Sequence, residues 1–265
     1  MISKIGKWTN DPPPKVIDVF GETWSLDVLD IPIPSKGQDA WMVGENSIVV
    51  VDGATPLDPS WPQDVDRFAA AIAESLCAGT LRWPDSPIED IWRRSILEMR
   101  EEFGTAGILR SAGAILLRTA GSNLEFSLLG DLVGAIKTSE GHVEVMTTRL
   151  TELDEMARKL GTRSALITNR QKANSTDGYW IFADDVKAAE HLTIATAPLR
   201  EVSSILLASD GYLYARTKIP HLILQAALTD GLMAPEPSDD KAILTHQDDV
   251  TAILLKRIKT APPIR

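Results

Sequence analysis

The chain has 265 residues and a formal net charge of −10, with 44% hydrophobic and 24% charged residues. This length allows one large core, and the negative charge argues against nucleic acid as a partner of the whole surface. No apolar run approaches the roughly 18 residues of a membrane span, and the first residues lack the apolar segment of a signal peptide. The single cysteine, Cys77, fits a reducing compartment. We therefore expect a cytoplasmic monomer that does not associate with membranes.

Strands and pairs of helices alternate along the chain. Apolar runs and two-residue alternation predict strands, whereas apolar residues that recur every three to four positions predict helices. Expected strands cover residues 16–20, 23–31, 41–43, 48–51, 111–118, 124–129, 133–137, 143–147, 203–208 and 250–255. Expected helices cover 65–79, with Gly79 as the stop, 86–103, 150–160, 163–170, 184–191, 220–230 and 238–244.

The order of these elements predicts the fold class. Residues 1–15 are polar, end in a run of prolines and predict a loose arm. Residues 16–258 contain no internal repeat and no break in composition, so we expect a single domain followed by a tail at 259–265. Strands, two helices, strands, helices and a last strand predict an α+β fold. In this four-layer α-β-β-α sandwich, two antiparallel sheets pack together with helices outside.

Four aspartates occupy similar positions at the ends of predicted strands. Asp52 ends the β-branched run 48–51, Asp131 and Asp210 follow apolar runs, and Asp248 precedes the last strand. If these strands are neighbours, the carboxylates meet at one edge and repel one another unless protons or cations intervene. All-oxygen ligands suit Mg²⁺ or Mn²⁺, and the four histidines lack the spacing of a zinc site. For Asp52-Gly53 alone, an ordinary Asp-Gly turn is the alternative.

Six short motifs resemble, in the same order, those of the metal-dependent serine/threonine protein phosphatases of type 2C. They are Gln38-Asp39-Ala40, Val51-Asp52-Gly53, Ser111-Ala112-Gly113-Ala114, Leu129-Gly130-Asp131, Leu207-Ala208-Ser209-Asp210-Gly211 and Asp248-Asp249-Val250-Thr251. Each motif alone is weak, but their order over about residues 24 to 256 is specific. The compact chain is similar to diverged bacterial members, and the resemblance implies the same sandwich fold.

The resemblance also implies a role for each acid. The expected ligands of two Mn²⁺ or Mg²⁺ ions are Asp52, Gly53 through its carbonyl, Asp210 and Asp248, with Asp131 for a weaker third ion. Asp39 would act through a metal-bound water. Such a pair of ions activates a water and neutralises phosphoryl oxygens, and the implied substrate is phosphoserine or phosphothreonine in a phosphoprotein.

Three positions depart from the family pattern. Pro34 stands where an arginine usually binds the phosphate, and the nearby cation, Lys36, lacks the two-pronged fork of arginine. No histidine follows Asp52-Gly53 to act as general acid, and Tyr214 replaces an acid often found four residues after Asp210. Two alternatives therefore stay open: a pseudophosphatase that serves as a regulatory or binding module, and a phosphatase of small phosphoesters.

Overall fold

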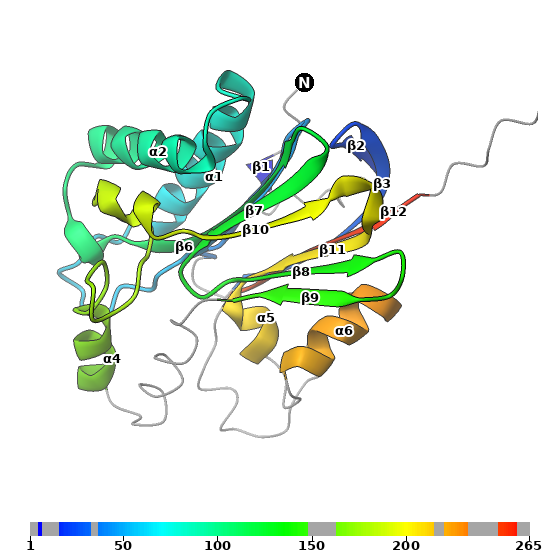
Figure 1. Cartoon of the computed structure of the whole chain (residues 1–265). Helices are drawn as coiled ribbons and strands as arrows, with labels where there is room; N and C mark the ends of the chain where they lie inside the picture. The colour runs from blue at the N-terminus through cyan, green and yellow to red at the C-terminus, as the bar shows by residue number, and fades with distance from the viewer. Residues whose placement is uncertain are drawn as a thin grey trace, which may run out of the picture.

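A computed structural model describes residues 5–6, 16–32, 37–147, 163–214, 220–232 and 249–258. Two six-stranded antiparallel sheets pack face to face and carry helices on their outer sides (Figure 1). The predicted α+β sandwich is thereby confirmed. The expected helices at 150–160 and 238–244, together with Lys36, Asp248 and the C-terminal tail, lie outside the described residues.

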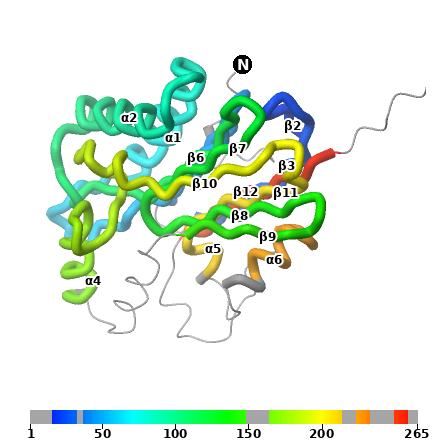
Figure 2. Tube along the Cα trace, in the orientation of Figure 1, coloured from blue at the N-terminus to red at the C-terminus, as the bar shows by residue number. Residues whose placement is uncertain are grey.

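Each sheet joins segments that are far apart in the sequence. The first has the order β1-β4-β5-β6-β7-β10 and the second β2-β3-β12-β11-β8-β9, so β12 lies between β3 and β11 (Figure 2). The strands of the first sheet are β1 Ile5–Gly6, β4 Ala40–Val43, β5 Ser47–Gly53, β6 Ala112–Ala120, β7 Asn123–Leu129 and β10 Thr193–Pro198. Those of the second are β2 Val16–Val19, β3 Glu22–Ile31, β8 Val133–Thr138, β9 Val143–Met146, β11 Val202–Ala208 and β12 Val250–Arg257.

The helices cover the outer faces of the sandwich. On the first sheet lie α1 Val65–Arg82 and α2 Ile88–Phe103, and on the second lie α5 Asp210–Tyr214 and α6 Pro220–Asp230. A further helix, α4 Arg163–Arg170, precedes β10. No helix of the described ranges is long and apolar enough to span a membrane.

Three layers of apolar side chains hold these elements together. One layer lies between the first sheet and α1 and α2, one between the two sheets, and one between the second sheet and α5 and α6. Along β5, Val50 packs between the sheets and Val51 packs toward the helices. Both faces of β5 are buried, which explains why its sequence is a continuous β-branched run rather than an alternating one.

Three sequence expectations need correction. Helix α1 continues past Gly79 to Arg82, because this glycine serves packing and not termination: a Cβ there would stand 2.9 Å from Ile91 Cγ2 of α2. Strand β10 is absent from the sequence prediction because its small and polar residues are mostly exposed and show no apolar alternation. Within the expected loose arm, β1 pairs with β4.

We predict that Ser127→Ala lowers the free energy of unfolding by about 1–3 kcal/mol, the cost of a buried donor left without its acceptor. Trp92 Nε1 of α2 donates to Ser127 Oγ of β7 at 2.8 Å, and both side chains are fully buried. The matched control, Ser122→Ala at an exposed turn, should change stability by about 0.5 kcal/mol or less. Chemical denaturation measures both, and equal losses would contradict the role of this hydrogen bond.

Candidate functional site

Asp39 and Asp52 occupy neighbouring positions at one end of the first sheet. β4 pairs with β5 so that Ala40 lies opposite Val51. One step outward in the same register brings Asp39 opposite Asp52. Residues directly opposite each other in an antiparallel pair have Cβ atoms about 5 Å apart. The two carboxylates therefore start from adjacent points on adjacent strands.

Gly53 is required by the close approach of this same strand pair. A Cβ at residue 53 would stand 2.5 Å from the carbonyl oxygen of Gln38 and 2.6 Å from Val65 Cγ1. The backbone of Gln38 therefore occupies the place of a side chain, and any larger residue would push the two strands apart. The Asp-Gly sequence is thus more than an ordinary turn, because Gly53 lets the segment before β4 lie against the end of β5.

Both aspartates belong to the face of the first sheet that is turned toward the second. On β5, Val50 packs between the sheets, and Asp52 follows it by two positions on the same side. On β4, Trp41 packs between the sheets, and Asp39 precedes it by two positions. Asp39 and Asp52 therefore lie just beyond the last apolar residues of the core between the sheets, on the same face.

Asp131 reaches this same face because two glycines let a turn lie directly on β6. Gly113 of β6 is the register partner of Asp52, and a Cβ at Gly113 would stand 3.2 Å from Asp131 Oδ1. A Cβ at Gly130 would stand 2.5 Å from the Cα of Gly113, and the φ of Gly130 is +91°. The side chain of Leu132 and the carboxylate of Asp131 thus share the space that a side chain at residue 113 would occupy.

Asp249 connects the second sheet to the segment that carries Asp39. Its carboxylate is nearly buried, with the residue only 3% exposed, although it stands immediately before β12. Asp249 Oδ2 accepts hydrogen bonds from the backbone N–H groups of Gln38 and Asp39, the second at 3.2 Å. Backbone donors of this kind stabilise a charged carboxylate in a buried position. The contact holds the acid ends of the two sheets together.

Asp30 of β3 adds a further carboxylate beside Asp249. Its Oδ2 accepts a hydrogen bond of 3.1 Å from Trp41 Nε1. Burial raises the pKa of Asp30, the indole donor lowers it, and the negative charge of Asp249 raises it further, so the net shift is upward. The inner end of the sandwich is therefore electrostatically unfavourable for another negative charge.

Asp210 lies at the end of the second sheet, where it begins α5, and is 3% exposed. Just before it, the Ser209 N–H donates to the Thr251 carbonyl at 2.9 Å, and the Thr251 N–H donates to Ser209 Oγ at 3.0 Å. These bonds keep the ends of β11 and β12 together. Asp210 and Asp249 therefore sit on neighbouring strands at the same end of the sheet.

The acids thus gather from both sheets at one end of the sandwich, and their donor atoms decide which ion they suit. Carboxylate and carbonyl oxygens are hard ligands that fit Mg²⁺ or Mn²⁺ better than zinc. In the described part of the chain, no three His, Cys, Asp or Glu residues are grouped so as to hold a metal on their own. The predicted ligand Asp248 and the predicted phosphate contact Lys36 fall outside that part, and both remain predictions.

Sequence reasoning missed Asp30 and gave Asp249 no role of its own. Asp30 had a readable signal: it stands two positions after Val28, where the alternation of β3 calls for an inward apolar residue. Asp249 had no signal beyond its place next to Asp248 in the last motif, because its hydrogen-bond partners are more than 200 positions away in the chain.

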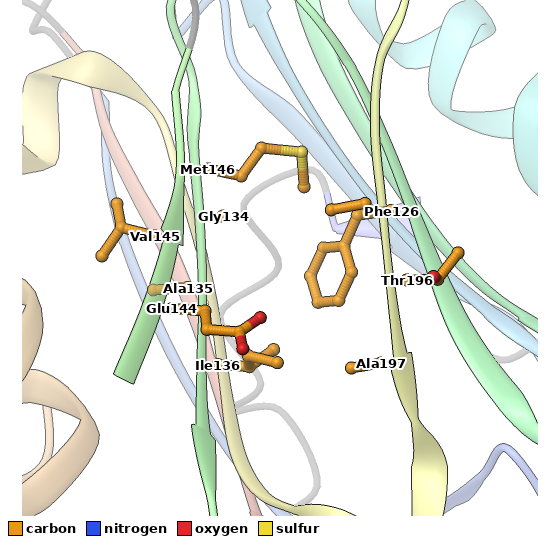
Figure 3. Close-up of a pocket in the computed structure, with 10 residues that line it drawn as sticks. Phe126, Gly134, Ala135, Ile136, Glu144, Val145, Met146, Thr196 and Ala197 are labelled. Carbon is orange, nitrogen blue, oxygen red and sulfur yellow. The ribbon is translucent and has the colours of Figure 1, made fainter. Parts of the chain in front are cut away.

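A separate pocket lies between the sheets near β7, β8, β9 and β10. It has a volume of about 80 Å³ and is lined mainly by apolar residues such as Phe126, Ile136 and Met146. Glu144 is the one charged residue among those that line it (Figure 3). A single carboxylate in an apolar wall offers no pair of groups for acid–base or nucleophilic chemistry. The end of the sandwich where Asp39, Asp52, Asp131, Asp210 and Asp249 gather, called the acid edge below, is therefore the better candidate.

Comparison with solved structures places the fold among known phosphatases. The PPM Ser-Thr phosphatase MsPP from Mycobacterium smegmatis, solved with cacodylate, superposes with a TM-score of 0.56 at 16% identity over 88% of this chain and 97% of that one. Serine/threonine phosphatase Stp1 from Staphylococcus aureus gives a TM-score of 0.56 at 12% identity, over 92% and 98%. RsbX in complex with magnesium gives 0.51 at 12% identity, over 97% and 100%.

These identities are low, so the likeness concerns the fold. No protein-family profile and no curated protein sequence matches the chain. The structural neighbours confirm that the chain has a fold like that of the type 2C phosphatases, as the six motifs had indicated.

We predict that Gly130→Ala destabilises the fold by about 1–3 kcal/mol more than Gly141→Ala, because its Cβ would overlap the backbone of Gly113. Gly141 is a matched control, since it has the same φ of +91° with nothing within 4 Å of its Cβ position. Both variants place an alanine at the same positive φ. The difference between their losses of stability therefore measures the clash of the new Cβ with Gly113. Thermal and chemical denaturation measure it, and equal destabilisation would mean that the turn does not rest on β6.

We further predict that Asp30→Asn is more stable than the wild type at neutral pH without added metal. The pKa of Asp30 is raised in the folded chain, so its ionisation weakens the fold as the pH rises through the folded pKa. The amide oxygen of Asn can still accept from Trp41, and the advantage should shrink as the pH falls below that pKa. Denaturation from neutral to acidic pH measures this; Asp27→Asn, at an exposed position of the same strand, is the control. If the extra stability of Asp30→Asn grew as the pH fell, it would contradict a raised pKa for Asp30.

Proposed function

We propose that the chain is a metal-dependent phosphatase that hydrolyses phosphoserine or phosphothreonine in phosphoproteins. The observation that carries the proposal is the gathering of Asp39, Asp52 and Asp131 on one face of the first sheet, against the end of the second. Phosphate esters are anions, and an acid-lined site attracts them only if it also holds cations. The phosphatase fold of the structural neighbours supports the same function.

The metal ligands under this proposal are Asp52, the Gly53 carbonyl, Asp210 and Asp248, with Asp131 for a further ion. When bound, two Mg²⁺ or Mn²⁺ ions supply an activated water and neutralise the phosphoryl oxygens. The bound magnesium of RsbX, one of the structural neighbours, supports a hard divalent ion in this fold.

Protein groups that do not bind metal directly also contribute to the proposed site. Asp249 fixes the backbone of Gln38 and Asp39 through its two accepted hydrogen bonds, and so orients the side chain of Asp39. That side chain is an acceptor next to Asp52, suited to hold a water in place. Apolar residues between the sheets, such as Trp41 and Val50, close the inner side of the site to bulk water.

The second candidate is a pseudophosphatase that binds a partner without turnover. Two observations favour it. Pro34 stands in the position of the expected arginine, and no histidine follows Asp52-Gly53 to act as general acid. In this case the acid edge would keep its structural link through Asp249 and would have lost efficient phosphate binding.

We predict that the purified protein hydrolyses a phosphothreonine peptide with Mn²⁺ and that EDTA stops the reaction. Asp52→Asn should lower the rate by at least about 100-fold, since even groups behind the ligands cost 10–100-fold. The same variant should be as stable as the wild type without metal, because it relieves repulsion between carboxylates. Phosphate release and thermal denaturation measure the two effects.

Asp85→Asn is the control for a lost surface charge, because Asp85 lies at an exposed turn between α1 and α2. It should retain wild-type activity. No hydrolysis by the wild type with either metal would favour the pseudophosphatase, whereas activity on small aryl phosphates but on no phosphopeptide would indicate a small phosphoester as substrate.

A further inference from the structure

We propose that Arg170 of α4 binds the phosphoryl group of the substrate and takes over the contact that Pro34 cannot make. This inference rests on the proposed function and adds a substrate-binding residue to it. Arg170 lies far from the acids in sequence, and none of the motifs that resemble the phosphatase family contains it.

A hydrogen bond places the Arg170 guanidinium beside the acid edge. Its Nη1 donates to Ser111 Oγ at 3.3 Å. The Ala54 N–H donates to the Ser111 carbonyl at 3.1 Å, so β5 and β6 continue as a pair at this point. Ser111 is two positions from Gly113, the partner of Asp52, which corresponds to about 7 Å along a strand. One phosphoester group with its contacts spans such a distance.

Strand alternation puts Ser111 on the acid side of the sheet. Side chains two positions apart project from the same face, and Asp131 Oδ1 lies 3.2 Å from the position that a Cβ of Gly113 would take. The intervening Ala112 instead packs toward α1 and α2. The Arg170 guanidinium therefore approaches the face that carries Asp52 and not the helix-covered face.

The segment after α4 is hydrogen-bonded to the start of β6 and to the turn before Asp131. Phe182 and Ala112 exchange two backbone hydrogen bonds of 2.9 and 3.0 Å. The Gly130 N–H donates to the Trp180 carbonyl at 3.1 Å. The chain from α4 to Phe182 thus extends the first sheet next to Asp131, and Figure 1 shows α4 at the end of the sheet where β6 begins.

The charge of Arg170 is available to a ligand. Across the described residues, no carboxylate forms an ion pair with it, and the bond to Ser111 uses one of five N–H donors. Two other arginines near β6 are paired, Arg110 with Asp64 and Arg118 with Glu125. A partly buried guanidinium beside an acid cluster, with no carboxylate of its own, is complementary to a phosphate dianion, which it can bind through two parallel hydrogen bonds.

The test compares four proteins in steady-state kinetics with Mn²⁺: wild type, Arg170→Ala, Arg170→Lys and Arg67→Ala. Arg67 forms an exposed ion pair with Glu102 on the outer helices and controls for a lost arginine. Arg170→Ala should lower kcat/KM by about 10- to 100-fold, the worth of a charge-assisted hydrogen bond. Arg170→Lys should recover part of the loss, and Arg67→Ala should match the wild type.

The choice of substrate and a fourth variant make the proposal falsifiable. A phosphopeptide and an aryl phosphate share only the phosphoryl group, so Arg170→Ala should affect both equally; a loss on the peptide alone would overturn the phosphoryl contact. Ser111→Ala removes the tether but keeps the cation and should cost less than Arg170→Ala. Equal losses would mean that the arginine only positions α4, and an unchanged kcat/KM for a folded Arg170→Ala would also overturn the proposal.

A binding measurement separates this inference from the proposed function. If the wild type shows no turnover, the proposed function fails, but calorimetry with inorganic phosphate and Mn²⁺ still tests Arg170. The proposal expects phosphate binding that weakens at least about 10-fold in Arg170→Ala. Equal affinities for the two proteins, or no phosphate binding by the wild type, would overturn it.

Discussion

The buried carboxylate of Asp249 is the constraint on which the acid edge depends. A charge that is only 3% exposed is costly unless donors surround it, and the backbone N–H groups of Gln38 and Asp39 meet that requirement. The result is a link between the start of β12 in one sheet and the entry to β4 in the other. It holds the backbone of Gln38 and Asp39 in place, while the β4–β5 register sets Asp39 opposite Asp52. Burial, with the nearby charge of Asp249, also raises the pKa of Asp30.

Local patterns in the sequence predicted the sandwich, whereas the contacts that build the site depend on distant pairs. The β-branched run before Asp52 predicted a strand buried on both faces. Such a strand has a continuous apolar sequence whichever strands lie beside it. Nothing local shows that Gly113 and Gly130 must touch so that Asp131 can lie beside Asp52. Gly79 resembles a helix stop because a glycine has the same appearance in the sequence whether it ends a helix or admits a neighbour. Arg170 and Ser111 are 59 positions apart, and only the fold brings them together.

The enzyme and the binding module differ in where positive charge is needed. An edge with several carboxylates repels itself and repels phosphate, so catalysis requires cations both among the acids and beyond them. Arg170 offers such a charge on the far side of Ser111, and Lys36 remains a prediction at the entry to β4. A binding module would keep the Asp249 link for its structural value and would need neither a metal nor a free guanidinium. The proposed role of Arg170 is therefore the feature that distinguishes the enzyme from the binding module.

The claim that the acids of both sheets form one site for a hard divalent ion is tested most directly by anomalous X-ray diffraction from crystals grown with Mn²⁺. The account predicts a manganese peak in contact with the carboxylate of Asp52 and the carbonyl of Gly53, and loss of that peak in Asp52→Asn. Manganese found elsewhere on the surface, with none at Asp52 in the wild type, would contradict it.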